Sequence, residues 1–477
     1  MWQWNTYVGE YVRIPESARF AKEESTRQTS SESRSTRMAE TRSSAPFWRL
    51  RGGGCGPSKL STDHSIDASD HVPPTVTWTE QDEMSCWVEQ SRSASEALWM
   101  AAPYRFGTLR DLLECTTLVR IQWLVSVGKR SGDEARFGGV IPSWQQLPVS
   151  ARITVRQMLA TRLFGQLPVL VLSYPWLDKA HPDPHGLVLA RILPFLELLA
   201  RQCGHSGTVG VLWDFLSFPQ RGYNEHSDPS VDDRPDWQRA RFKRGLSRIN
   251  EFYVHPFTIV LRVDVPISQI VAGAASVNLT PIEKRGWCIF EAQIASIVKD
   301  TRCFLSLARF ESSSVESWES VVLMCRAGRS APLDPDRLDA MMREGVADGS
   351  IVFTAGADLE SIVLPNYRSG FVRAFSEANV LEYGHLGWDD DQVRSLTSTL
   401  VFASRAGVTC SLSTIALHDN RISRECAMAL ATALHEQKAA GTMPHLSRLI
   451  LADNKLITSN SCDELAMLSA IPFVRLT

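Results

Sequence analysis

The middle of the chain alternates short apolar runs with longer amphipathic stretches. The apolar runs cover 169–173, 209–214, 257–263 and 303–307. Each run is nearly continuous in apolar residues, which is typical of strands that are covered on both faces. Helical spacing of apolar residues occupies the intervening stretches at about 186–202, 237–253 and 286–299. This order of strands and helices predicts an α/β domain with a parallel sheet and right-handed crossovers.

The C-terminal region repeats itself every 34 residues, because this shift aligns Leu381 with Ile415 and Leu449. Three further sets align under the same shift, namely Tyr383, Leu417 and Leu451, then Leu386, Asn420 and Asn454, then Trp388, Ile422 and Leu456. Leu396 and Leu430, which lie between the aligned runs, recur at the same spacing. Each copy therefore predicts a short strand followed by a return helix.

The second copy reads Leu412-x-x-Ile415-x-Leu417-x-x-Asn420-x-Ile422. This pattern resembles the leucine-rich repeat of the ribonuclease-inhibitor type, and the resemblance implies a short solenoid over 379–477 with a concave surface for a protein partner. The period is longer than the usual one because 438–443 looks inserted, and Leu386 replaces asparagine in the first copy, which we interpret as a cap. The tetratricopeptide repeat shares this period, but the strand-like consensus and the asparagines argue against an all-helical repeat.

The regions outside the α/β pattern are predicted to be either disordered or helical. Residues 21–45 contain 7 Ser and 4 Thr but no aromatic or branched aliphatic residue, so they cannot bury enough apolar surface to offset their ordering entropy. We therefore expect 1–75 to be a disordered Ser/Arg-rich region. Helical leucine spacing predicts a helical preamble over 76–165, and we interpret 311–378 as a helical extension of the central domain.

Composition narrows the classes of protein that fit this chain. Its 477 residues predict about three domains, and its 44% apolar residues are ordinary for a globular protein. The net charge of −3 gives no global attraction to nucleic acid, so no nucleic-acid partner is expected. The 10 cysteines are scattered, which favours reduced thiols over a disulfide scaffold. We expect no membrane span, because no apolar stretch is long enough, and a cytoplasmic location.

Candidate chemistry gathers at the predicted strand ends. The residues are Ser173, Tyr174 and Trp176 after the first strand, Asp214 after the second, and Trp287 and Glu291 in the helix after the third. In a parallel sheet, ligands bind beyond the carboxyl ends of the strands. Trp287 and Glu291 are one helical turn apart, so they share a face of their helix.

An apolar strand ending in Ser-Tyr, an acidic residue after the second strand and the motif Trp287-Cys288-x-x-Glu291 resemble a TIR (Toll/interleukin-1 receptor) domain. The resemblance covers about 166–310 and implies a three-layer, TIR or flavodoxin-like α/β fold. In catalytic members of the family this glutamate is essential for cleaving the N-glycosidic bond of NAD. The resemblance therefore implies a catalytic role for Glu291, with NAD as substrate and with no cofactor. The connection over 219–235 is longer and more acidic than the usual BB loop of the family.

In glycoside chemistry a carboxylate stabilises an oxocarbenium-like transition state or orients the ribose hydroxyls, and Glu291 is the candidate for this role. The candidate ligand-binding residues are Ser173, Tyr174, Trp176, Asp214 and Trp287. Main-chain amides near Gly186, at the start of the next helix, are candidates for a phosphate. The two histidines of His181-Pro-Asp-Pro-His185 suggest a solvated loop rather than a metal site, because no third ligand is evident, so no metal ligand is assigned.

Three hypotheses, from two classes of function, remain open. The first is an intracellular signalling or immune-type interaction protein, whose repeats recognise a protein partner and whose TIR-like domain self-associates. The second is an NAD glycohydrolase acting through Glu291, and a related nucleoside-processing activity is a weaker third. Many TIR domains act only in assembly, and a carboxylate near a helix start is also favoured by the helix dipole. The tryptophans are individually expected to be core residues.

Overall fold

The computed structural model describes residues 2–5, 10–13, 112–154, 157, 161, 163, 166–203, 207–271, 277–326, 328–455 and 471–476. The chain divides into two units, Met1–Val76 and Thr77–Thr477. In the first unit, β1 (Trp2–Asn5) pairs antiparallel with β2 (Glu10–Arg13). This hairpin was not expected from the sequence, although β1 alternates tryptophan with polar residues as strands do. The rest of 1–75 lies outside the described residues, so its disorder stays a prediction.

The centre of the second unit is a five-stranded mixed sheet in the order β3-β5-β4-β6-β7. Its strands are β3 (Val119–Arg120), β4 (Val169–Ser173), β5 (Gly210–Leu212), β6 (Ile259–Arg262) and β7 (Phe304–Ser306). Strands β4 to β7 run parallel, as predicted, and β4 pairs with both β5 and β6. The edge strand β3 runs antiparallel to β5 and comes from the region expected to be a helical preamble.

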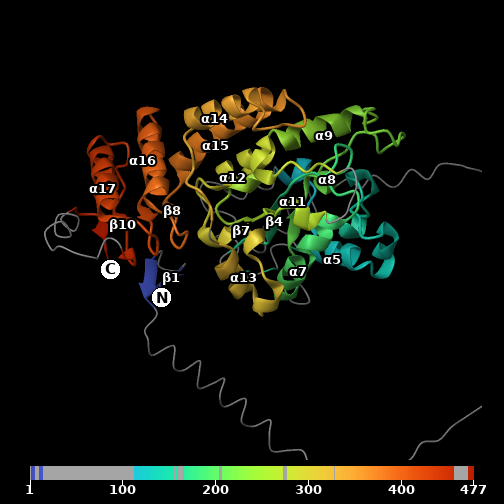
Figure 1. Ribbon diagram of the computed structural model, residues 1–477, viewed down its shortest axis with the longest axis horizontal. Coiled ribbons are helices and arrows are strands. Elements are labelled where there is room, and N and C mark those ends of the chain that lie inside the picture. Colours follow the sequence, from blue (N-terminus) through green and yellow to red (C-terminus); the bar gives the residue numbers. More distant parts are fainter. Residues whose placement is uncertain are drawn as a thin grey trace, which may run out of the picture. The chain divides into compact units, whose positions relative to one another are not determined.

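Helices cover both faces of this sheet (Figure 1). Leu170 and Leu172 belong to one apolar cluster with α5 (Ile121–Lys129), α7 (Leu187–Gln202), α11 (Ile267–Ile270) and α13 (Trp318–Cys325). Val169 and Val171 belong to a second cluster with α10 (Asn250–Val254), α12 (Gly286–Ala295), α14 (Pro335–Ala347) and α15 (Leu364–Glu377). Alternate residues of β4 thus face opposite helical layers, which is compatible with a three-layer α/β fold.

The remaining elements of the central region are short or lie at its surface. They are α8 (Asp214–Ser217), α9 (Asp236–Leu246), the 3-10 helices η2 (Gly132–Phe137), η3 (Trp144–Gln146), η4 (Val149–Ala151), η5 (Ile282–Lys284), η6 (Thr301–Cys303), η7 (Leu307–Arg309) and η8 (Ser312–Ser314), and the π-helix η9 (Leu359–Val363). Among the described residues, no helix is both long and apolar enough to cross a membrane. The cysteines that the structure describes are free thiols.

The C-terminal region forms a second sheet of four parallel strands, β8 (Val380–Glu382), β9 (Thr414–Ala416), β10 (Arg448–Ile450) and β11 (Val474–Arg475). Leu381 pairs with Ile415, and Ile415 pairs with Leu449, so the predicted alignment of the repeat is confirmed. Helices α16 (Asp390–Arg405) and α17 (Arg424–Ala439) follow β8 and β9 (Figure 1). The third expected return helix falls in 456–470, outside the described residues, and β11 was not predicted.

Two buried asparagines hold successive turns of this region together. Asn420 Nδ2 donates to the carbonyls of Tyr383 and Leu417, each at 2.9 Å, and its Oδ1 accepts from Trp388 N. Asn454 repeats the pattern one copy later, where Nδ2 donates to Leu417 O and Leu451 O and Oδ1 accepts from Ile422 N. Each side chain therefore satisfies backbone groups of its own turn and of the preceding one.

A buried arginine connects the central region to the second sheet. The Arg329 side chain is 2% exposed and donates to the carbonyl oxygens of Lys299 and Glu382 at 2.5 and 2.6 Å. Its guanidinium lies 5.0 Å from the ring centroid of Tyr383, which stacks on Trp388. The Trp388 indole N–H donates back to Arg329 O. This set of contacts fixes the loop after β8 against the segment that follows α13.

Candidate functional site

Glu291 lies on α12, the helix that begins beside the carboxyl ends of the central strands. The helix starts at Gly286, where a Cβ atom would meet the Phe353 ring at 2.1 Å, so only glycine allows this close approach. Burial of the Glu291 carboxyl raises its pKa to about 8, and the charge of Asp214 adds to the rise. The hydroxyls of Ser173 and Tyr253 and the charge of Arg262 act in the opposite direction. These four side chains therefore lie near enough to the candidate carboxyl to affect its ionisation.

Ser173 is the last residue of β4, and its side chain is part of this group. The residue is 1% exposed, and its Oγ atom has no hydrogen-bond partner of normal geometry among the described residues. It nevertheless lies near enough to Glu291 to lower the pKa of that carboxyl.

Asp214, in contrast, has its oxygens occupied by the protein itself. Tyr174 Oη donates to Oδ1, the Trp176 indole N–H donates to Oδ2 at 3.0 Å, and Phe215 N donates to Oδ1 at 2.7 Å. Burial raises the pKa of Asp214, and these three hydrogen bonds oppose that rise. Three of the predicted ligand-binding residues, Tyr174, Trp176 and Asp214, are thus brought together, but as one internally bonded cluster.

Trp287 and Cys288 contact different groups from those near Glu291. The Trp287 indole N–H donates to Asp358 Oδ2 at 2.9 Å, just before η9. The indole nitrogen of Trp287 therefore binds Asp358 and not Ser173 or Asp214. The predicted contact of Trp287 with a ligand stays a prediction. Cys288 is 3% exposed and donates to Tyr174 O at 3.5 Å, and burial raises the pKa of its thiol well above the usual value. It is a structural thiol.

Tyr253 and Arg262 were not among the site residues predicted from the sequence. Tyr253, on α10, donates its hydroxyl to Leu172 O at 2.9 Å, and burial followed by the charge of Glu291 raises its pKa. Arg262 ends β6 and pairs in register with Ser173. A charged residue inside the otherwise apolar run at 257–263 was a usable signal for Arg262. No local pattern marks Tyr253, because its position depends on how α10 packs.

The N-terminus of α7 is closed by a side chain from the preceding loop. Asp183 is 0% exposed, and its two carboxylate oxygens accept from Val188 N and Leu189 N at 3.0 and 2.9 Å. The backbone N–H of Asp183 donates to His181 Nδ1, and His181 Nε2 contacts Ile141 O at 2.9 Å. The interpretation of 181–185 as a solvated loop is therefore wrong. The amides considered for phosphate are already bound by a buried carboxylate.

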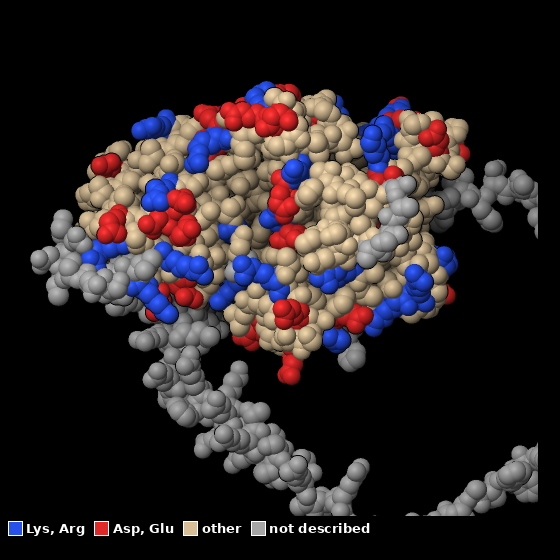
Figure 2. Space-filling model, in the orientation of Figure 1, with Lys and Arg blue, Asp and Glu red and all other residues tan. Residues whose placement is uncertain are grey.

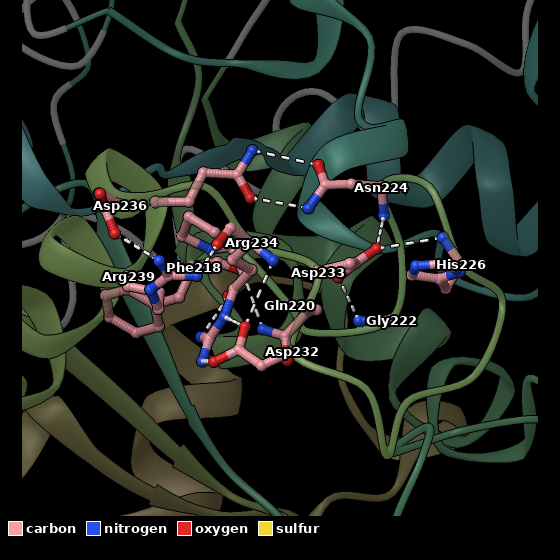
Figure 3. A network of polar contacts seen from close by, with 12 residues as sticks. Phe218, Gln220, Gly222, Asn224, His226, Asp232, Asp233, Arg234, Asp236 and Arg239 are labelled. Carbon is pink, nitrogen blue, oxygen red and sulfur yellow. Dashed lines mark hydrogen bonds and ion pairs between the residues drawn. The ribbon is translucent and has the colours of Figure 1, made fainter.

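The acidic connection over 219–235 is organised by its own carboxylates (Figure 3). Asp233 accepts from the backbone N–H groups of Gly222, Asn224, Glu225 and His226 at 2.6 to 3.3 Å. Although desolvation opposes it, hydrogen bonding to these amides lowers the pKa of Asp233 to about 2. Asn224 exchanges two amide hydrogen bonds with Gln238. At least one acidic side chain of this segment is therefore structural, because the Asp233 carboxylate holds the loop closed.

The surroundings of Glu291 determine the protonation state of its carboxyl. With a pKa of about 8, its carboxyl is protonated at neutral pH and becomes a carboxylate only in mild alkali. The site therefore holds a proton donor at pH 7 next to the hydroxyls of Ser173 and Tyr253 and the guanidinium of Arg262. Within the described part of the chain, no group of three or more His, Cys, Asp or Glu side chains could hold a metal ion.

Comparisons of the chain with models of protein families, with curated proteins and with solved structures found no match.

Proposed function

We propose that the chain is a signalling or immune-type interaction protein, in which leucine-rich repeats recognise a protein partner and a TIR-like domain transmits the event. The observation that carries this proposal is the pair of asparagines, Asn420 and Asn454, which make equivalent hydrogen bonds in successive copies of the repeat. Leu381, Ile415 and Leu449, each 0% exposed, occupy paired positions on the parallel strands. Asparagines and inward leucines in these places support a leucine-rich-repeat solenoid.

The strand residues flanking the inward leucines face the other side of this sheet. Val380 and Ile450 are two of them, and both are partly exposed. On a solenoid of this type they would contribute to the concave recognition surface. Partner binding through the repeats therefore depends on these positions, whereas it does not depend on exposed apolar residues elsewhere, such as Val372 on α15.

Quantitative affinity purification tests this proposal. The full chain is compared with Ile450→Asp and with the matched control Val372→Asp, after equal melting temperatures show that both variants are folded. A co-purifying protein that Ile450→Asp loses at least about tenfold, and that Val372→Asp retains, supports recognition through the repeats. A set of co-purifying proteins that responds equally to the two variants contradicts it.

The second candidate function is hydrolysis of NAD through Glu291. It is favoured by the grouping of Glu291 with Ser173 and Tyr253, since buried hydroxyls beside a carboxyl can orient the hydroxyls of a ribose. In this reaction the N-glycosidic bond breaks, nicotinamide leaves with the bonding electron pair, and water adds to the ribose carbon with loss of a proton. The Glu291 carboxylate stabilises the oxocarbenium-like transition state.

Nicotinamide release by the full chain tests the enzymatic candidate. Glu291→Gln should lower the rate at least about tenfold, whereas Glu319→Gln, an exposed residue of α13, should leave it unchanged. Because the acting form is the carboxylate, the rate should rise as the pH approaches and passes 8. The assay is repeated at high protein concentration, since self-association is part of the proposal. No release at either concentration rejects the enzymatic candidate.

A further inference from the structure

A hollow of about 850 Å³ opens at the carboxyl edge of the second sheet, away from Glu291. One wall is formed by the central region, through Arg309 and the segment 328–330. The other wall is formed by the loops that follow β8, β9 and β10. Figure 2 shows basic and acidic side chains gathered close together below the place that β8 occupies in Figure 1. The contacts of Arg329 and Trp388 fix these two walls relative to each other.

The repeat itself places charged side chains around this hollow. His385, Asp419 and Asp453 occupy equivalent positions in the three copies, and all have left-handed backbone, with φ of 60°, 52° and 58°. Each turn redirects the chain after its strand in the same way. The residues two positions later, Gly387, Arg421 and Lys455, also line the hollow. Equivalent turns in successive copies thus bring Arg421 and Lys455 to one surface.

Some charged side chains of this lining are bound by other protein groups, and others are not. The Asp419 carboxylate is bound by His385, and the Asp389 carboxylate accepts from the N–H groups of Asp391 and Gln392 at the start of α16. The side chains of Arg309 and Arg421 are exposed, and neither makes a hydrogen bond or an ion pair with another residue that the structure describes. Two arginines from opposite walls therefore line the hollow with their guanidinium donors available.

We propose that this hollow binds a small organic anion through a phosphoryl group held between Arg309 and Arg421. The planar guanidinium donates paired hydrogen bonds that match phosphate geometry, and two of them on opposite walls suit a group with several anionic oxygens. The volume lies in the range of small-molecule sites, so the phosphoryl group would belong to a larger ligand.

The tryptophan at the hollow is not available to such a ligand. Trp388 is 2% exposed and stacks on Tyr383 with ring centroids 4.8 Å apart. The site therefore recognises anionic charge rather than a stacked base, and a sugar or polyol phosphate fits it better than a nucleobase does. This ligand site is independent of protein recognition by the repeats and of the chemistry at Glu291.

Calorimetric titration of the full chain with pyrophosphate tests the inference. The double variant Arg309→Gln/Arg421→Gln should bind at least about tenfold more weakly, and Arg405→Gln, an exposed arginine at the far end of α16, should bind as the unchanged protein does. Asp453→Asn should bind several-fold more tightly, because it removes an anionic charge from the lining while asparagine tolerates the left-handed backbone.

Three results would contradict the proposal. Absence of binding to the unchanged protein at millimolar pyrophosphate overturns the proposal, as does equal affinity of the double variant. Succinate binding as tightly as pyrophosphate overturns the assignment to a phosphoryl group. The melting temperature of each variant without ligand is measured first, so that a loss of binding is not confused with a loss of folding.

Discussion

His385 Nδ1 lies 2.6 Å from Asp419 Oδ2, and the two residues occupy the same position in successive copies of the 34-residue repeat. His418 Nε2 lies 3.1 Å from His385 Nε2, with the rings nearly perpendicular. When His385 Nδ1–H donates to Asp419, its Nε2 atom can only accept, so His418 Nε2–H is the donor. The two imidazoles and one carboxylate thus form a chain that links the first two copies.

This chain makes the C-terminal region sensitive to acid. Burial, followed by the charge of His385, lowers the pKa of His418 to about 4. Because the unfolded histidine binds a proton near pH 6.5 and the folded one does not, stability falls as the pH drops from about 6.5 toward 4. We expect a loss of about 2 kcal/mol at pH 5 relative to pH 7.5.

Urea unfolding at pH 7.5 and pH 5 measures this loss. In His418→Gln the difference between the two pH values should shrink by about that amount, whereas His445→Gln, at an exposed position, should keep it. An unchanged pH dependence in His418→Gln would show that other groups are responsible.

The interior position of β4 predicts a large effect of a charge at Leu170. This residue is 0% exposed and lies in register between Val211 of β5 and Ile259 of β6. Leu170→Asp would place an unpaired carboxylate in this apolar setting and should cost more than about 4 kcal/mol, enough to unfold the central region. Val149→Asp is the matched control, because Val149 is 66% exposed. Circular dichroism melting distinguishes the two, and a normal melting curve for Leu170→Asp would contradict an interior strand.

The asparagines of the repeat should be important for stability. Asn420→Ala leaves the backbone groups of Tyr383, Leu417 and Trp388 without their buried partner, so we expect a loss of about 1–3 kcal/mol. Asn454→Ala should have a similar effect. Asn379→Ala, at an exposed position just before β8, should change the free energy of unfolding by less than about 0.5 kcal/mol. Chemical denaturation of the three variants makes the comparison, and equal stabilities would argue against the structural role of the asparagines.

Glu291 should be destabilising in its ionised form. Its pKa in the folded protein, about 8, lies above the ordinary value of 4.5, so stability is fully present below pH 4.5 and is lost as the pH rises toward 8. Glu291→Gln removes this loss. We therefore expect the variant to gain stability relative to the unchanged protein as the pH is raised from 5.5 to 8.5, as measured by thermal melting. Glu319→Gln should show no such trend, and a constant difference for Glu291→Gln would mean that its carboxyl ionises normally.

Elements with strong local patterns were predictable from the amino-acid sequence. The apolar runs at 169–173 and 257–263 became β4 and β6, and the 34-residue shift matched the strand register at Leu381 and Ile415. These features follow from side-chain periodicity, because a strand or helix must bury its apolar face wherever it lies. The gathering of Ser173 and Asp214 around Glu291 was foreseeable in part, since parallel strands bring their carboxyl ends to one edge.

Contacts between distant segments were decided only by the tertiary structure. Tyr174 and Trp176 follow β4 and bind Asp214, which follows β5, so these hydrogen bonds depend on the pairing of the two strands. The antiparallel strand β3 formed in a region with a helical pattern. The pKa of Glu291 depends on burial under packed helices, and the hollow beside Arg421 depends on how Arg329 fixes the second sheet. None of these has a local signature, because burial and charge proximity depend on the distance through space between residues far apart in the chain.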